Sequence, residues 1–219
     1  MITLAVEAST YVGSVCVARG RDVLAAGEVA MRDPRSERLL PAIAATLRDA
    51  GVQIADADRI VCGAGPGSFT SLRIAAAIAK GLAMTVERPL FAVSSLALMV
   101  AAIQPALAAG EYLAVLDALR GEAYAATCVV DDGGEVAAVS SVRLLPAEEI
   151  DALEQAGGVV VGEGRRVRGA PHARGLVRTA ALFERGAPVD LARWEPDYGR
   201  VAEAQRRWEA AHGRALPHA

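Results

Sequence analysis

The chain has few of the residues on which most enzyme centres are built: three histidines, three cysteines and one lysine among 219 residues. His172, His212 and His218 contain no pair at i, i+4 spacing, which excludes a zinc or iron site built on His-x-x-x-His. Ser68 has no identifiable histidine-and-acid relay, so nucleophilic catalysis is unsupported. We therefore expect no catalytic residue, no metal and no cofactor.

Long apolar runs are also missing. No stretch reaches the roughly 18 apolar residues of a membrane span, and Met1–Leu4 lacks the basic region and cleavage site of a signal peptide. Cys16, Cys62 and Cys128 lie far apart in apolar, strand-like runs, which favours buried, reduced thiols. These features predict a cytoplasmic protein that makes no contact with a membrane.

Charge is unevenly distributed along the chain. The net charge is −3, but residues 1–156 carry a balance of −7 and residues 157–219 a balance of +4. The arginine-rich C-terminal portion, which includes the segment 165–178, has the charge to contact RNA or an acidic partner, although a solvated surface explains it more simply. Because there is no aromatic platform or basic stripe, we expect no autonomous nucleic-acid binding.

Apolar patterning predicts a mixed α/β fold. Strands followed by alternating helices and strands give the order β-β-β-α-β-α-β-α over the first hundred residues. The expected strands are 2–6, 12–17, 23–29, 59–62 and 89–93, and the expected helices are 36–50, 70–84 and 95–103. A meander followed by this alternation indicates a ribonuclease-H-like unit with a mixed sheet.

The second half of the chain is predicted to be a smaller copy of the same unit. Its expected elements are strands at 112–116, 123–130, 136–144 and 159–161, a short helix from Pro146, a loop at 165–175 and a final helix at 200–212. We therefore expect an N-terminal subdomain over residues 1–104 and a smaller C-terminal subdomain over residues 105–219.

The glycine turn, residues 63–68, joins an apolar strand to an alanine-rich helix. Its three glycines let the backbone turn where side chains would clash, and Ser68 or Thr70 can cap the helix. A glycine loop at a helix N-terminus is also a candidate anion site. However, no Gly-Lys-Ser/Thr and no Gly-x-Ser-x-Gly is present, so the turn is neither a Walker loop nor a nucleophile elbow.

Two further segments are candidate phosphate turns. In actin-like ATPases the first strand ends in an acid that approaches phosphate and Mg²⁺, and Glu7, Ser9 and Thr10 occupy that place. Asp117 and Gly121 can form the opposing turn at the start of the second half. The alternative is a vestigial arrangement in which Glu7 caps the sheet edge, and both interpretations stay open.

Together these motifs resemble the bacterial TsaB family of tRNA threonylcarbamoyladenosine biosynthesis proteins, formerly described as glycoprotease-like. Residues 65–74 are similar to that family's hallmark, and 7–10, 36–41 and 117–124 are similar to its other motifs. Weaker signatures lie at 162–164 and 196–200. The departures from the family pattern are Glu7 for Asp, Ser71 for Gly, and Arg35 in place of a common His. Ser71 adds bulk near a helix start, so we expect it to alter a partner contact.

The resemblance implies an α/β fold of the actin-like, ribonuclease-H-like class, with two subdomains that each hold a mixed sheet flanked by helices. It also implies a non-catalytic scaffold or dimerisation subunit that binds and activates TsaD, the paralogue that transfers the threonylcarbamoyl group. TsaE, an ATPase, would join a ternary complex, and tRNA would be met only through that complex. An isolated copy can pair with itself through the same surface.

The expected interface lies on two helices, where small residues permit a close approach and an aromatic residue anchors the edge. Its residues are Arg35, Leu39, Leu40, Ile43, Phe69, Arg73, Ile74, Ala76, Ala77 and Lys80.

Another class of function is an autonomous actin-like ATPase or phosphotransferase that uses Glu7, Ser9, Thr10 and Asp117. The short second half lacks a clear adenosine-binding glycine pair with a following helix, which counts against it. A peptidase is a distant third interpretation.

Overall fold

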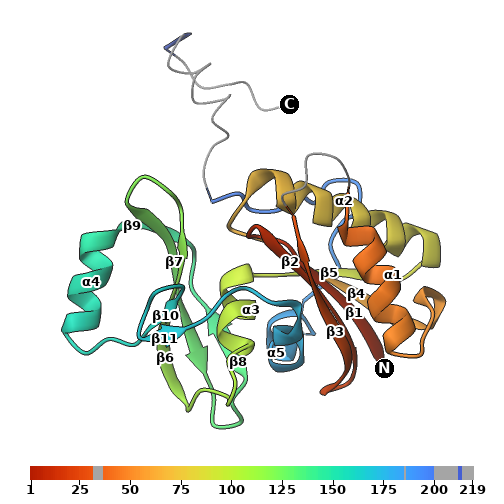
Figure 1. Ribbon diagram of the computed structural model, residues 1–219, viewed down its shortest axis with the longest axis horizontal. Coiled ribbons are helices and arrows are strands. Elements are labelled where there is room, and N and C mark those ends of the chain that lie inside the picture. The colour runs from red at the N-terminus through yellow and green to blue at the C-terminus, as the bar shows by residue number, and fades with distance from the viewer. Residues whose placement is uncertain (32–36, 185, 200–211, 214–219) are drawn as a thin grey trace.

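The computed structural model describes residues 1–31, 37–184, 186–199 and 212–213 of the chain. It has two lobes, each built on a mixed sheet, with helices α3 and α5 between them (Figure 1). The two-sheet α/β architecture expected from the sequence is confirmed.

The first lobe holds a five-stranded sheet in the order β3-β2-β1-β4-β5. Its strands are β1 (Ile2–Glu7), β2 (Val12–Arg19), β3 (Asp22–Ala30), β4 (Arg59–Gly63) and β5 (Leu90–Val93). The first three form an antiparallel meander, and β4 and β5 run parallel to β1. A 3₁₀ turn at Ile54–Asp56 leads into β4.

Helices α1 (Leu39–Asp49) and α2 (Phe69–Val86) pack on one face of this sheet, because Leu39, Ile43, Ala75 and Ala79 share a buried core with Leu4. α2 is the one helix in the described part of the chain whose length and composition would let it cross a membrane. Its contacts with β4 and β1 identify it instead as a sheet-covering helix.

Pro41 fits inside α1 because the helix begins at Leu39 rather than at residue 36. Pro41 therefore lies in the first helical turn, where a backbone N–H has no intrahelical acceptor to lose.

The second lobe holds a sheet in the order β11-β10-β6-β7-β8, with β9 also paired to β7. Its elements are β6 (Gly110–Asp117), β7 (Glu122–Val130), β8 (Val136–Val139), β9 (Arg143–Pro146), α4 (Ala147–Gln155), β10 (Val160–Gly162) and β11 (Val167–Arg168). A 3₁₀ segment at Ala173–Arg178 and α5 (Ala180–Phe183) follow.

Two expectations for this lobe are wrong. The single strand expected over 136–144 is two strands, and where the first one ends the Thr127 N–H donates to the Ser140 hydroxyl instead of to a backbone carbonyl. The loop expected over 165–175 contains β11 and the start of the 3₁₀ segment.

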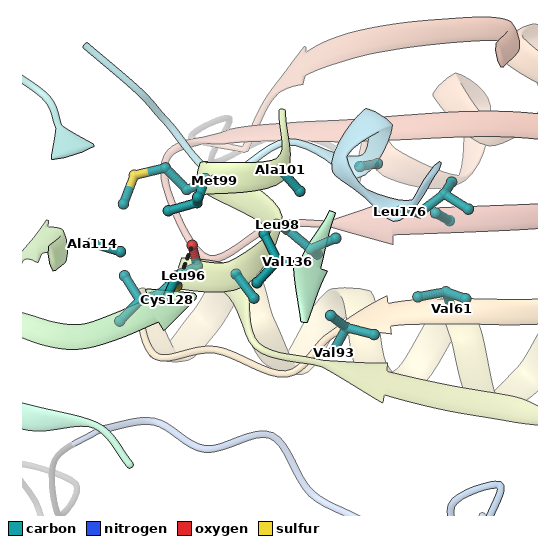
Figure 2. Packing of buried hydrophobic residues seen from close by; sticks show 14 of the residues in the cluster. Val61, Val93, Leu96, Leu98, Met99, Ala101, Ala114, Cys128, Val136 and Leu176 are labelled. Atoms are coloured by element: carbon teal, nitrogen blue, oxygen red, sulfur yellow. Dashed lines mark hydrogen bonds between the residues drawn. The ribbon is translucent and has the colours of Figure 1, made fainter. Parts of the chain in front are cut away.

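Helix α3 (Ser95–Ala101) joins the two lobes through one core, and all of its residues are buried. It ends at Ala101 rather than at the expected Ile103. Figure 2 shows its side chains among residues of both sheets, with Val61 and Val93 on one side and Ala114 and Cys128 on the other. A core that is shared in this way fixes one lobe against the other.

After α5 the chain returns to the first lobe along a segment that we call the strap, residues 189–199. The Val189 N–H donates to the Leu90 carbonyl at the edge of β5, and Leu191 and Trp194 pack against the α1–α2 core. The expected boundary at residue 104 assigns the strap to the second subdomain, although it packs on the first. Residues 200–211 of the final helix expected over 200–212 lie outside the described part.

Candidate functional site

Each glycine of the glycine turn lies against a segment from elsewhere in the chain. A Cβ would overlap the Glu7 carboxylate at Gly63, the Asp197 carbonyl oxygen at Gly65 and the Ser9 carbonyl oxygen at Gly67. Gly65 and Gly67 also have positive φ angles of 91° and 156°. The glycines are therefore required by close packing within the chain.

Hydrogen bonds hold these two segments and the start of α3 at the turn. The Ser68 N–H donates to the Ser9 carbonyl at 2.7 Å, and the Asp197 N–H donates to the Ala64 carbonyl at 2.7 Å. The Gly65 N–H donates to the Ser95 hydroxyl at 3.0 Å. The turn is thus a junction of β1, the start of α3 and the strap, and these groups are not available to a phosphate.

The expected capping of α2 is wrong. Ser68 stands at the N-cap position, but its Oγ lies 3.1 Å from the Ser71 Oγ and caps no backbone N–H among the described residues. Thr70 lies inside the helix. Ser71 is buried, so its extra bulk relative to glycine faces the interior and has no exposed surface on which to alter a partner contact.

Glu7 is fully buried beneath the glycine turn. Its carboxylate accepts from the Ser95 hydroxyl at 2.8 Å and from the Ser9 N–H. Burial raises its pKa because the charged form loses its hydration, although the hydrogen bonds from Ser9 and Ser95 oppose this rise. The carboxyl therefore ties β1 to α3, which agrees with a structural rather than a metal-binding role.

The other predicted phosphate turn is exposed. The Asp117 carboxylate accepts from the Leu119 N–H at 2.8 Å, and Leu119, Arg120 and Gly121 all have positive φ. In the first candidate turn, the Thr10 hydroxyl donates to the Val12 carbonyl and accepts from the Val12 N–H. Each of the two candidate turns is therefore closed by local hydrogen bonds.

A cleft of about 680 Å³ lies between the lobes, and Thr10 lines it together with Leu116, Met99 and Ile103. Glu7, Ser9, Asp117 and Gly121 are not among its lining residues. This cleft therefore contains only Thr10 of the predicted phosphate residues.

Sequence reasoning missed the role of His172 in this cleft. Its Nδ1 accepts from the Arg174 N–H at 2.9 Å, and its Nε2 lies 3.4 Å from a Glu28 carboxylate oxygen. Burial lowers the pKa of His172 to about 4, with a further lowering from Arg174 and an opposing effect from Glu28. A neutral imidazole thus connects the second half of the chain to β3.

The three cysteines are free and buried, as expected. Burial raises the thiol pKa of Cys16 and Cys128 to about 12 and that of Cys62 further still. The thiolate is the reactive form of cysteine, and a raised pKa leaves little thiolate near neutral pH, so these thiols are unreactive. Among the described residues there is no group of three His, Cys, Asp or Glu side chains arranged for a metal ion.

The predicted interface residues divide into an exposed set and a buried set. Leu40, Phe69, Arg73 and Ala77 are exposed, and Ile74 and Lys80 are half-buried. Leu39, Ile43 and Ala76 are buried in the chain's own core and support the helices from beneath. Arg35 lies outside the described residues.

The exposed set continues along α2 through two residues that sequence reasoning did not select. Gly81 and Met84 are exposed and extend the line Phe69, Arg73, Ala77 at roughly four-residue spacing. That helical spacing was the signal that could have found them. We call the exposed residues Leu40, Phe69, Arg73, Ala77, Gly81 and Met84 the docking face.

The strap reaches the edge of the docking face with two aromatic rings. The Tyr198 ring lies 4.5 Å from the Phe69 ring at a tilt of 49°, and the Arg73 guanidinium lies 5.3 Å from the same Phe69 ring. The Lys80 ammonium lies 5.7 Å from the Trp194 ring. No local sequence pattern indicates these contacts, because the strap is distant from α2 in the sequence.

Two lobes that each hold a mixed sheet flanked by helices, with a glycine turn and a shared helix between them, define a protein of the actin-like ATPase fold class. The structure is similar to YeaZ from Pseudomonas aeruginosa, with a TM-score of 0.72 and 29% identity over 90% of this chain and 99% of that chain. A second Pseudomonas aeruginosa structure, described as similar to peptidase YEAZ, gives a TM-score of 0.73 and 28% identity over 91% and 99% of the two chains.

The chain belongs to the TsaB family. It is 33% identical to the tRNA threonylcarbamoyladenosine biosynthesis protein TsaB of Escherichia coli over 75% of this chain and 72% of that protein. The Bacillus subtilis protein of the same name is 27% identical over 95% and 98%. Residues 28–168 also match the family model described as TsaD, tRNA N6-adenosine threonylcarbamoyltransferase.

Proposed function

We propose that this chain is a non-catalytic subunit of the tRNA threonylcarbamoyladenosine-forming complex, and that it binds and activates the TsaD transferase. The observation that carries the proposal is the docking face, an exposed line of mostly apolar or small residues along α2 together with the exposed Leu40 of α1. Only 33% of the residues of α2 are buried within the chain, so the outer face of the helix is available to a partner. The names of the related proteins support a role in tRNA threonylcarbamoyladenosine biosynthesis.

The docking face has the composition of a helix-packing surface. Ala77 and Gly81 have little or no side chain, so a partner helix can approach closely at the centre of α2. Leu40 and Met84 add exposed apolar area. Arg73 and Lys80 favour a partner helix with acidic residues along that flank.

The non-catalytic part of the proposal is supported by the state of the candidate chemical groups. Glu7 is buried in a hydrogen-bonded network, and neither Glu7 nor Asp117 lines the interlobe cleft. We therefore expect calorimetry with Mg·ATP to give no binding heat for the isolated chain. Tight one-to-one binding would instead support the autonomous ATPase.

Two experiments test the function in the cell and in solution. Tagged chain is expected to co-purify with TsaD, and deletion of its gene is expected to lower the threonylcarbamoyladenosine content of tRNA. Re-expression of the wild-type gene should restore the modified nucleoside. Normal modification after deletion, together with no stable complex, would contradict the proposal.

The remaining partner expectations are part of the same proposal. TsaE is expected to join only when TsaD is present, and tRNA is expected to be retained only by the assembled complex. In the absence of TsaD, pairing of two copies through the docking face would give a homodimer, which light scattering would detect.

A further inference from the structure

The strap is fixed to the first lobe at both ends. At its start the Val189 N–H donates to the Leu90 carbonyl, and near its end the Asp197 N–H donates to the Ala64 carbonyl at 2.7 Å. Gly65, which has no Cβ, allows the Asp197 carbonyl oxygen to approach. The strap is therefore an integral part of the first lobe, held by hydrogen bonds and close packing.

The last strap residue also contacts both lobes. Gly199 has a φ of 68°, and a Cβ there would overlap the Tyr124 ring of β7 and lie against Pro66 of the glycine turn. The end of the strap is thus held between the lobes, and its path beside α2 is determined by packing.

Between these anchors the strap places rings against side chains of α2. Phe69 has the Tyr198 ring and the Arg73 guanidinium beside it, and Trp194 lies under Lys80. Aromatic and arginine side chains are the types that contribute most to binding at protein interfaces. Their mutual contacts fix their positions before any partner arrives, which lowers the entropic cost of association.

We propose that the strap is a structural part of the docking face, so that the transferase partner contacts Tyr198 and Trp194 as well as α1 and α2. This inference rests on the proposed function and adds a segment to its interface. The occupant is the same partner because Tyr198 and Trp194 contact Phe69 and Lys80, and Phe69 belongs to the docking face.

Hydrogen exchange with and without purified TsaD tests this inference. Peptides from α2 and from residues 189–199 are both expected to exchange more slowly in the complex. Slower exchange in α2 with no change in the strap would overturn the inference while leaving the proposed function intact. Faster exchange in the strap would also overturn it, because the partner would then displace the strap. If no complex forms at all, the proposed function itself fails.

Substitutions in the strap give an independent test. Tyr198→Ala is expected to raise the Kd for TsaD about tenfold or more, the effect of removing an interface hot spot. Tyr198→Phe keeps the ring on Phe69 and is expected to stay within about twofold of wild type. Arg193→Ala is the matched control in the same segment, because the Arg193 side chain is 89% exposed and paired only with Asp190 among the described residues. If the Kd of Tyr198→Ala stays near the wild-type value, as that of Arg193→Ala is expected to do, the inference is contradicted.

Discussion

At the residue scale, Glu7 and His172 are buried titratable groups whose surroundings favour their neutral forms. Glu7 accepts from Ser95 and Ser9 beneath the glycine turn, and His172 accepts from the Arg174 N–H near Glu28. Both connect segments that are distant in the sequence. These contacts lie within the chain, and each residue makes a prediction about stability.

Replacement of Glu7 separates its charge from its hydrogen bonds. Glu7→Gln keeps an oxygen acceptor in nearly the same volume, so it is expected to lower the free energy of unfolding by less than Glu7→Ala does. Glu7→Ala leaves the Ser9 N–H and the Ser95 hydroxyl without their acceptor and creates a cavity, so a loss of about 2–4 kcal/mol is expected. Urea unfolding measures both. Equal losses of unfolding free energy for the two variants would show that the hydrogen bonds to the Glu7 side chain do not contribute to stability.

His172 predicts a loss of stability in acid. Its pKa is lowered to about 4 in the folded chain from an ordinary value of 6.5, so between these values the unfolded chain binds a proton that the folded chain does not. Stability is therefore expected to fall as the pH is lowered through this window.

His172→Asn tests the assignment, because the Asn oxygen can accept from the Arg174 N–H without titrating. Urea unfolding between pH 6.5 and 4 should show a shallower decline for this variant than for wild type. Identical pH profiles would assign the acid sensitivity to other groups.

At the element scale, the glycine turn was predicted as a strand-to-helix connection, and its position was correct. The residues that require its glycines were not predictable. The Asp197 carbonyl meets Gly65 and the Ser9 carbonyl meets Gly67 only in the folded chain. Local sequence shows that a side chain is absent, but it does not show what fills the space. Similarly, only the strand pairing reveals that the predicted 136–144 strand is divided in two at Ser140.

A substitution at Gly65 tests the junction. Gly65→Ala adds a Cβ that overlaps the Asp197 carbonyl oxygen at a φ of 91°. We expect a loss of about 2–4 kcal/mol from strain and overpacking together, and faster hydrogen exchange in the strap.

Gly20→Ala is the matched control for this variant. Gly20 has a φ of 60° with nothing within 4 Å of a Cβ, so the control carries the backbone strain of about 1–2 kcal/mol without the overlap. If Gly65→Ala costs no more than Gly20→Ala and the strap exchanges as before, the junction does not depend on the absence of a Cβ.

At the scale of the whole molecule, hydrophobic periodicity was sufficient to predict two α/β lobes, since strand and helix patterns depend on local residues. It did not predict that α3 would be enclosed by both lobes or that the strap would return to the first one, because these are long-range contacts. The docking face was predicted in part. Periodicity located α1 and α2, but it could not separate the outward Leu40 and Ala77 from the inward Leu39 and Ala76.

The arginine-rich segment 165–178 is also clarified at this scale. Arg165 pairs with Asp151 and Glu154, and Arg178 donates to the Ala101 and Ile103 carbonyls at the end of α3. The charge of Arg165 and Arg178 therefore serves contacts within the chain, a role that neither the RNA-binding nor the solvated-surface interpretation included.

The most direct test of the account is the affinity of the purified chain for purified TsaD, measured by calorimetry for wild type, Ala77→Glu and Ala152→Glu. Glu at position 77 can pair with Arg73 and Lys80 along α2, so the variant should stay folded while a carboxylate blocks the centre of the docking face. Ala152 is an exposed helical residue in α4 of the other lobe and serves as the matched control. We predict a complex for wild type and Ala152→Glu and at least a tenfold weaker one for Ala77→Glu. Equal binding by all three chains, or binding by none, would contradict the account.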